Sequence, residues 1–138
     1  MSDERRQQEG LELRRRVLGE EAIARSLAVE PEFMRAFQEL ANENYASVWG
    51  RTEQLPLKLR TLVTVAILSA LGTEPELRLH LHGAARAGWT REEIGEVFLH
   101  TTLYAGAPRG QHAMALAREV FAERERAQGD PGGPAAGE

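Results

Sequence analysis

Residues 74–110, EPELRLHLHGAARAGWTREEIGEVFLHTTLYAGAPRG, decide the fold of this chain. Pro75 opens an amphipathic helix that ends at Gly88, because proline suits a first helical turn and glycine suits a helix end. Thr90 and Glu93 then have the spacing of a capping box, which predicts the start of a second helix. That helix continues until a corner containing glycine and proline breaks it. Two helices joined by a capped turn indicate a helical fold.

The rest of the chain follows the same helical periodicity, with apolar residues three and four positions apart. The segment 55–71 is apolar on nearly every face, a pattern typical of a helix buried on all sides. Burial between subunits would explain such a helix in so small a domain. No strand pattern of period two is present. The sequence therefore predicts an all-α domain of six to seven helices, with a charged N-terminal helix or arm over 1–18 and further helices over 20–27, 31–49, 55–71 and 109–126.

The 138-residue chain has the length of one domain, which we place at residues 1–127, followed by a disordered tail at 128–138. Its net charge of −4 provides no electrostatic attraction for nucleic acid. No apolar run is long enough to cross a bilayer and no signal peptide is evident, so we expect a cytoplasmic protein without a membrane partner. The chain has no cysteine, which excludes disulfides, thiolate metal sites and thiol redox chemistry.

His80 is the ionisable residue whose position most needs a reason. It lies on the apolar stripe of its helix with Leu77, Leu81 and Ala84. Glu76, one turn earlier, can reach its ring; a carboxylate there raises the pKa of a histidine and fixes its tautomer, whereas burial lowers the pKa. A histidine tuned in this way can act as a general acid or base. The alternative is a core histidine bonded to a carboxylate, and the pattern alone leaves both open.

The other histidines do not form a metal motif. His82 is turned roughly 200° around the helix from His80, and we expect it to face solvent or a subunit boundary. Metal chelation from one helix needs ligands four residues apart, and the chain has no HxxxH or ExxH pair. His100 and His112 fall on other predicted helices. We therefore expect neither a metal ion nor another cofactor.

Two arginines flank the entry to the apolar segment 55–71. Arg51 and Arg60 can clamp an anion, because a guanidinium binds a carboxylate through two parallel hydrogen bonds. They can equally be surface arginines at a helix start. Trp49 and Tyr104 can form the wall of a cavity, although packing is the commoner role of such aromatic residues.

Four motifs give the chain a resemblance to a known family: SVWGR at 47–51, LRLHL at 77–81, GWTREEI at 88–94 and YAGAP at 104–108. With these motifs, residues 5–125 resemble the carboxymuconolactone decarboxylase family, and within it the 4-carboxymuconolactone decarboxylase branch. The resemblance implies an alkylhydroperoxidase D-like helical fold that assembles into trimers or hexamers. A related branch uses a Cys-x-x-Cys pair where this chain has residues 73–76, so its thiol chemistry is excluded here.

The resemblance implies cofactor-independent decarboxylation of 4-carboxymuconolactone to an enol-lactone, in the protocatechuate and β-ketoadipate route of aromatic catabolism. It also supplies the expected site. The residues expected to be catalytic are His80, Glu76 and Arg60. The residues expected to bind substrate are Arg51, Trp49 and Tyr104.

In this interpretation His80 donates the proton or stabilises the oxyanion, and Glu76 orients it. The chain departs from the branch at His82, where arginine is usual, and at Arg109, which makes the YAGAP corner more basic. Whether Arg109 or His112 lines the site is open, and so is the substrate. Two alternatives remain: an enzyme for another small lactone or keto acid, and a non-catalytic helical oligomer that binds a small carboxylate or a partner protein.

Overall fold

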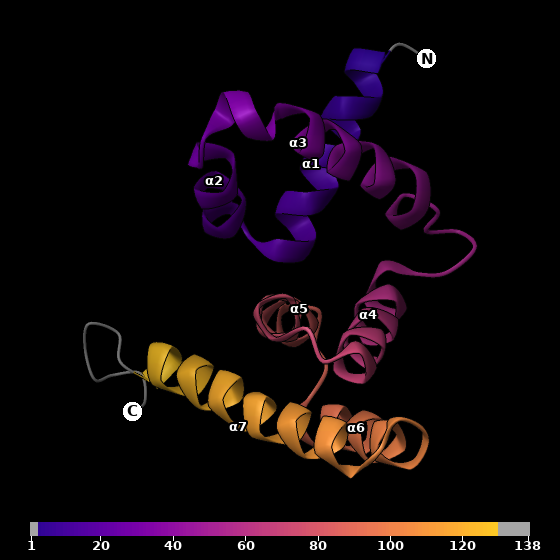
Figure 1. The fold of residues 1–138 in the computed structure, drawn as a ribbon, viewed down its shortest axis with the longest axis vertical. Helices are drawn as coiled ribbons and strands as arrows, with labels where there is room; N and C mark the ends of the chain where they lie inside the picture. Colours follow the sequence, from indigo (N-terminus) through magenta and orange to yellow (C-terminus); the bar gives the residue numbers. More distant parts are fainter. Residues whose placement is uncertain (1–2, 130–138) are drawn as a thin grey trace. The chain divides into compact units, whose positions relative to one another are not determined.

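The computed structural model describes residues 3–129, and these residues are almost entirely helical (Figure 1). Within them the chain forms seven α-helices and one π-helix and no strand, which confirms the all-α prediction. In chain order the elements are α1 (Asp3–Leu18), α2 (Glu20–Ala28), α3 (Pro31–Asn44), η1 (Tyr45–Trp49), α4 (Leu57–Leu71), α5 (Glu74–Arg86), α6 (Arg91–Ala105) and α7 (Ala107–Gly129).

The chain divides into two compact units, 1–61 and 62–138, and the division falls within α4. Each unit is described by itself, and the prediction of one domain over 1–127 stays a prediction. Of the predicted tail, residues 128 and 129 belong to α7, and residues 130–138 lie outside the described part of the chain.

In the first unit, α1 packs against α3 and η1. The helices approach closely at Gly10, where a Cβ would overlap the backbone carbonyl of Asn42. Buried polar groups then join the two helices: Arg14 donates from Nη1 to Asn42 Oδ1 over 2.8 Å, and Asn42 donates from Nδ2 to Gln7 Oε1 over 3.0 Å. The inward face of α3 is therefore polar.

The apolar face of α3 is exposed instead. Phe33, Phe37 and Leu40, which the sequence places on one helical stripe, are 79%, 58% and 60% exposed. Exposed apolar residues grouped on one helix face form a candidate interaction surface.

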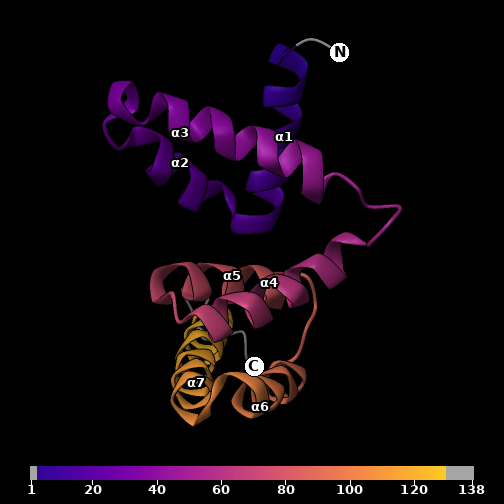
Figure 2. The same cartoon turned by 45° about the vertical axis from the view of Figure 1, so that its right-hand side comes forward.

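The second unit has a continuous hydrophobic core. α5 and α6 each pack one apolar face against α7, and Figures 1 and 2 show α6 and α7 side by side. Val65 of α4 is fully buried in the same core, and Ser69 Oγ lies 2.9 Å from Thr101 Oγ1 of α6. The buried members are Val65, Leu77, Leu81, Ala84, Ile94, Phe98, Ala113, Leu116, Ala117 and Val120.

The capping box that opens α6 is present as predicted. The Glu93 amide donates to Thr90 Oγ1 over 3.1 Å, and the Thr90 amide donates to Glu93 Oε1 over 3.0 Å. Two free helical donors are satisfied in this way, so the start of α6 is fixed by the sequence itself.

Helix α4 begins at Leu57 rather than at the predicted Leu55, because a residue before proline is driven out of the helical region. Within the single chain it is not buried on all sides, since Val63, Ile67 and Leu71 are about half exposed, and its burial between subunits stays a prediction. These three residues lie four positions apart, so they form one apolar stripe along α4.

Candidate active site

Helix α5 carries the two catalytic candidates that the pattern singled out. Leu77, Leu81 and Ala84 are buried in the core of the second unit and fix the rotation of the helix. Glu76 is exposed in the first turn, and His80, one turn later, is half-buried beside the buried stripe. The two side chains therefore lie on the same side of α5, as the spacing predicts.

The electrostatic environment keeps the imidazole of His80 neutral. The pKa of His80 is lowered to about 4, mainly by burial and to a lesser extent by the positive charge of Arg86, whereas Glu76 acts to raise it. Burial is the largest of these effects, so the pKa of His80 is lowered in spite of the Glu76 carboxylate. At neutral pH the ring has one N–H donor and one acceptor nitrogen.

Arg60 is engaged with the backbone of the loop that precedes α4. Its Nε donates to the carbonyl of Leu55 over 3.2 Å, and its Nη2 donates to the carbonyl of Arg51 over 3.0 Å. These bonds hold the loop in place, and they bring Arg60 next to the backbone of Arg51. The side chain of Arg51 is exposed.

Trp49 ends the π-helix η1. The Gly50 amide donates to the carbonyl of Tyr45 over 3.0 Å, a bond across five residues that defines a π-turn. This wider turn brings the rings of Tyr45 and Trp49 together, with centroids 5.3 Å apart and planes 5° apart. Burial raises the pKa of Tyr45 to about 12, so its hydroxyl stays protonated.

Tyr104 lies near the end of α6 and is 79% exposed. The ring of His100, one turn earlier, stacks on it with a centroid separation of 5.3 Å. Both rings line a mostly apolar hollow of about 510 Å³ between α4 and α6, whose other lining residues are Ala66, Ala70, Glu96, Val97, Thr101 and Ala105. The role of Tyr104 as a wall of the substrate site stays a prediction.

The six predicted site residues thus fall into two groups. Glu76, His80 and Tyr104 belong to the second unit, and residues 49, 51 and 60 belong to the first. Within the second unit Glu76 acts electrostatically on His80, and within the first Arg60 donates a hydrogen bond to the carbonyl of Arg51. The gathering of both groups in one site stays a prediction.

His82 is half-buried against α7, and the expectation that it faces solvent or a subunit boundary stays a prediction. Its Nε2 lies 3.3 Å from Glu123 Oε1, and its Nδ1 lies 3.4 Å from Nη1 of Arg124. Since arginine only donates, Nδ1 accepts and Nε2 carries the proton. Burial and the charge of Arg124 lower the pKa of His82, which favours this neutral form.

Arg78, one turn before His82, extends this contact between α5 and α7. Its guanidinium lies 2.6 Å from Glu119 Oε1 and 3.1 Å from Glu123 Oε2. No spacing in the sequence pairs the acidic and basic residues of α7 with α5.

A third contact that the sequence did not reveal lies at the corner between α4 and α5. Gly72 ends α4 with a φ of +76°, a backbone region that glycine adopts without strain. The guanidinium of Arg109 rests against it, and a Cβ on Gly72 would lie 2.6 Å from Arg109 Cζ. Next to this contact, His112 Nε2 lies 3.2 Å from Glu74 Oε1.

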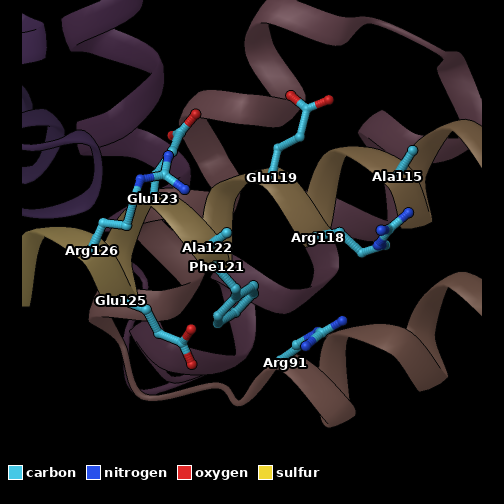
Figure 3. Close-up of a pocket in the computed structure, with 9 residues that line it drawn as sticks. All are labelled: Arg91, Ala115, Arg118, Glu119, Phe121, Ala122, Glu123, Glu125 and Arg126. Carbon is cyan, nitrogen blue, oxygen red and sulfur yellow. The ribbon is translucent and has the colours of Figure 1, made fainter. Parts of the chain in front are cut away.

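A separate hollow of about 540 Å³ lies along α7, at the start of α6 (Figure 3). Its rim carries charges of both signs, and Figure 3 shows Phe121 between α7 and Arg91 of α6. It contains none of the six predicted site residues. Among residues 3–129 no group of three or more histidine, aspartate or glutamate side chains is arranged to hold a metal ion, and no helix is long and apolar enough to cross a membrane.

Comparison with known proteins identifies the family. The profile of the carboxymuconolactone decarboxylase family matches residues 31–119, a range that contains all six predicted site residues. The chain belongs to this family. It is 45% identical over 122 residues to the 4-carboxymuconolactone decarboxylase of Acinetobacter baylyi, a match that covers 88% of this chain and 90% of the relative.

Two further relatives extend the range of the family. A nitrosuccinic acid decarboxylase of Metarhizium robertsii is 36% identical over 114 residues, which cover 82% of this chain and 79% of that protein. An uncharacterised 15.0 kDa protein of Paracoccus denitrificans is 33% identical over 115 residues, covering 77% of this chain and 86% of that protein. Two of these three relatives carry the name of a decarboxylase, although the named substrates differ.

Proposed function

We propose that this protein is a cofactor-independent carboxy-lyase that converts 4-carboxymuconolactone to an enol-lactone in aromatic catabolism. The observation that carries the proposal is the 45% identity, over nearly the whole of both chains, to a decarboxylase named for this substrate. The family match over residues 31–119 supports the same reaction class.

The substrate itself supplies the electron sink for this reaction. The carboxylate that leaves is joined through a ring C=C bond to the lactone carbonyl. When its C–C bond breaks, the electron pair moves through the double bond onto the carbonyl oxygen, and CO2 departs. A proton then adds to ring carbon to give the enol-lactone. The protein must hold the retained carboxylate, stabilise the oxyanion and direct the proton.

His80 is suited to stabilising the oxyanion. A pKa of about 4 leaves the imidazole neutral at pH 7, so its N–H can donate a hydrogen bond to the lactone oxygen without a prior proton uptake. For His80 to deliver the proton as well, the two negative charges of the substrate must raise its pKa on binding. Glu76 acts in the same direction, which supports its role as the residue that orients and polarises His80.

The first unit contributes substrate binding in this proposal. Arg51 has an exposed side chain that can bind a carboxylate. Arg60 donates a hydrogen bond to the backbone carbonyl of Arg51 and so positions this loop. Trp49 and Tyr104 supply aromatic walls. For the catalytic role of Arg60, the two bonds to carbonyl oxygens favour positioning of the loop over direct contact with the reacting atoms.

We also propose that the protein acts as a homo-oligomer, a trimer or hexamer as the family resemblance implies, in the cytoplasm. The support is the exposed apolar surface of α3 and the exposed stripe of α4, together with Leu99 and Leu103 of α6. Light scattering coupled to size-exclusion chromatography measures the mass directly. A monomer at micromolar concentration would contradict this part of the proposal.

The reaction is tested by incubating the purified protein with 4-carboxymuconolactone and following CO2 release and the loss of ultraviolet absorbance. Turnover without added cofactor is the expected result, and His80→Ala should lower kcat by roughly 10²–10⁴ if His80 is the general acid. Binding without turnover by the wild type would refute the enzymatic proposal. Near-normal kcat in a folded His80→Ala protein would refute only the assignment of His80.

The second candidate is decarboxylation of another small carboxylic acid. The named activity of the Metarhizium robertsii relative favours it, since that protein is 36% identical over most of both chains. Nitrosuccinate should therefore be tested beside the lactone under the same conditions. A higher kcat/KM for nitrosuccinate would replace the first proposal with the second.

A further inference from the structure

The arginines of the second unit differ in whether their guanidinium interacts with another side chain. Arg78 is paired with Glu119 and Glu123, Arg124 contacts His82, and Arg86 acts on the imidazole of His80. The remaining arginines of α6 and α7 have no ion pair to a carboxylate within residues 3–129; they are Arg91, Arg109, Arg118 and Arg126.

Three of these four belong to the hollow of Figure 3. Arg91, Arg118 and Arg126 line it together with three glutamates, Glu119, Glu123 and Glu125. Arg109 is different because it stands at the corner between α4 and α5, against Gly72. It is therefore the unneutralised guanidinium at the end of the helix that carries Glu76 and His80.

The guanidinium of Arg109 lies close to Gly72. Because Gly72 has no Cβ, this group can approach the backbone, and a side chain at position 72 would make it move. The side chain of Arg109 is exposed. An exposed arginine without an ion pair keeps its donors for a bidentate bond to a carboxylate.

The neighbouring polar groups leave that charge available. Glu74 is the nearest acidic residue along the chain, but its carboxylate is directed to His112 at 3.2 Å and to Arg78 at 4.0 Å. Beside Gly72, the hydroxyl oxygen of Thr73 is buried and has no hydrogen-bond partner in residues 3–129. A buried hydroxyl without a partner is uncommon in folded proteins. The corner thus combines a free cation with an unsatisfied polar group.

We propose that Arg109, which lies against Gly72, binds one carboxylate of the substrate. The inference rests on the proposed decarboxylation, and it assigns to the second unit a carboxylate contact that the first unit was expected to supply alone. The expected consequence is a defect in substrate binding rather than in the chemical step.

The experiment compares wild type, Arg109→Gln and Arg109→Lys, with Arg118→Gln as the matched control at another unpaired arginine. Two readouts are used. The first is KM and kcat with 4-carboxymuconolactone. The second is the Kd, by calorimetry, of the saturated analogue of this lactone, which keeps both carboxylates but lacks the ring double bond and cannot release CO2 by the same route. Circular dichroism verifies that each variant is folded.

We expect Arg109→Gln to raise KM and the Kd of the analogue by about 10- to 100-fold, the cost of losing a charged hydrogen-bonding pair. Its kcat should stay within about threefold of wild type, and Arg109→Lys should recover part of the loss because it keeps the charge without the fork. Arg118→Gln should behave as wild type. Unchanged KM and Kd in Arg109→Gln, or equal losses in Arg118→Gln, would overturn the inference.

Failure of the proposed function gives a different result. Suppose that wild type binds the saturated analogue through Arg109 but does not release CO2 from the lactone. The contact between Arg109 and a carboxylate is then supported, and the proposed decarboxylation is refuted. If wild type turns over the lactone and Arg109→Gln does so with the same KM, the decarboxylation stands and the anion contact falls. If wild type neither binds nor turns over, both are overturned.

Discussion

The low pKa of His80 should make the protein measurably less stable in acid. Above pH 6.5 the imidazole is neutral in both the folded and the unfolded chain, so its ionisation does not affect stability there. As the pH falls through 6.5 the unfolded chain takes up a proton, whereas the folded chain does so only at about pH 4. The free energy of unfolding therefore decreases across this window, and the loss is complete below pH 4.

The size of the effect follows from the two pKa values. A shift from 6.5 to about 4 corresponds, at 1.36 kcal/mol per unit, to a loss of about 3 kcal/mol. For a domain of this kind, whose total stability is roughly 5–15 kcal/mol, such a loss is large. Glutamine at position 80 fills a similar space and remains neutral, so His80→Gln should not show the loss.

The assay is urea unfolding of wild type and His80→Gln at pH 7, 6, 5 and 4, with His100→Gln, at an exposed histidine of α6, as a control for substituting a histidine as such. The stability of wild type relative to His80→Gln should fall by about 3 kcal/mol between pH 7 and pH 4. A difference that stays constant within about 1 kcal/mol would refute the argument that burial keeps His80 neutral. A titration of the His80 ring protons by nuclear magnetic resonance gives the pKa directly.

Three further predictions test the surroundings of the site. Arg86→Gln should raise the pKa of His80, because it removes a positive charge that lowers it; the same resonance titration measures the change. Thr90→Ala should lower the free energy of unfolding by about 1 kcal/mol in chemical denaturation, since the cap of α6 is lost; an unchanged midpoint would contradict it. Arg60→Ala should destabilise by about 1.5–3 kcal/mol, because two loop carbonyls lose a charged donor; equal stability with a higher KM would instead indicate a direct substrate contact.

The helices of this protein could be predicted from the sequence because their signals are local. Thr90 and Glu93 determine the start of α6 by bonding to each other, and glycine ends α4 where a positive φ is needed. The inward face of α5 follows from the spacing of its leucines, which places Glu76 and His80 on one side. Such features depend on residues a few positions apart, so they can be predicted from the local sequence alone.

The contacts between helices could not be predicted in the same way. Arg78 and His82 bind α7 through residues more than forty positions away, and nothing in either segment specifies the partner. The polar inward face of α3 was missed for a related reason. Phe33 and Phe37 suggest a core-facing stripe, but the buried Arg14 turns the other face of α3 inward. A pattern of apolar residues predicts that a helix face is buried, but it does not show whether the same unit or another surface buries that face.

The charge balance of the second unit connects its histidine with its arginine. A substrate with two carboxylates needs positive charge near it, and His80 provides none at neutral pH because burial keeps its ring neutral. Positive charge for the dianion must therefore come from other groups, and guanidinium groups stay charged at every relevant pH. Arg109 is exposed at the corner before α5, close to Gly72, and it forms no ion pair with a carboxylate within residues 3–129. In our proposal a neutral donor for the oxyanion and a cation for the carboxylate are complementary, because the cation binds the charge already present and the donor stabilises the charge that develops.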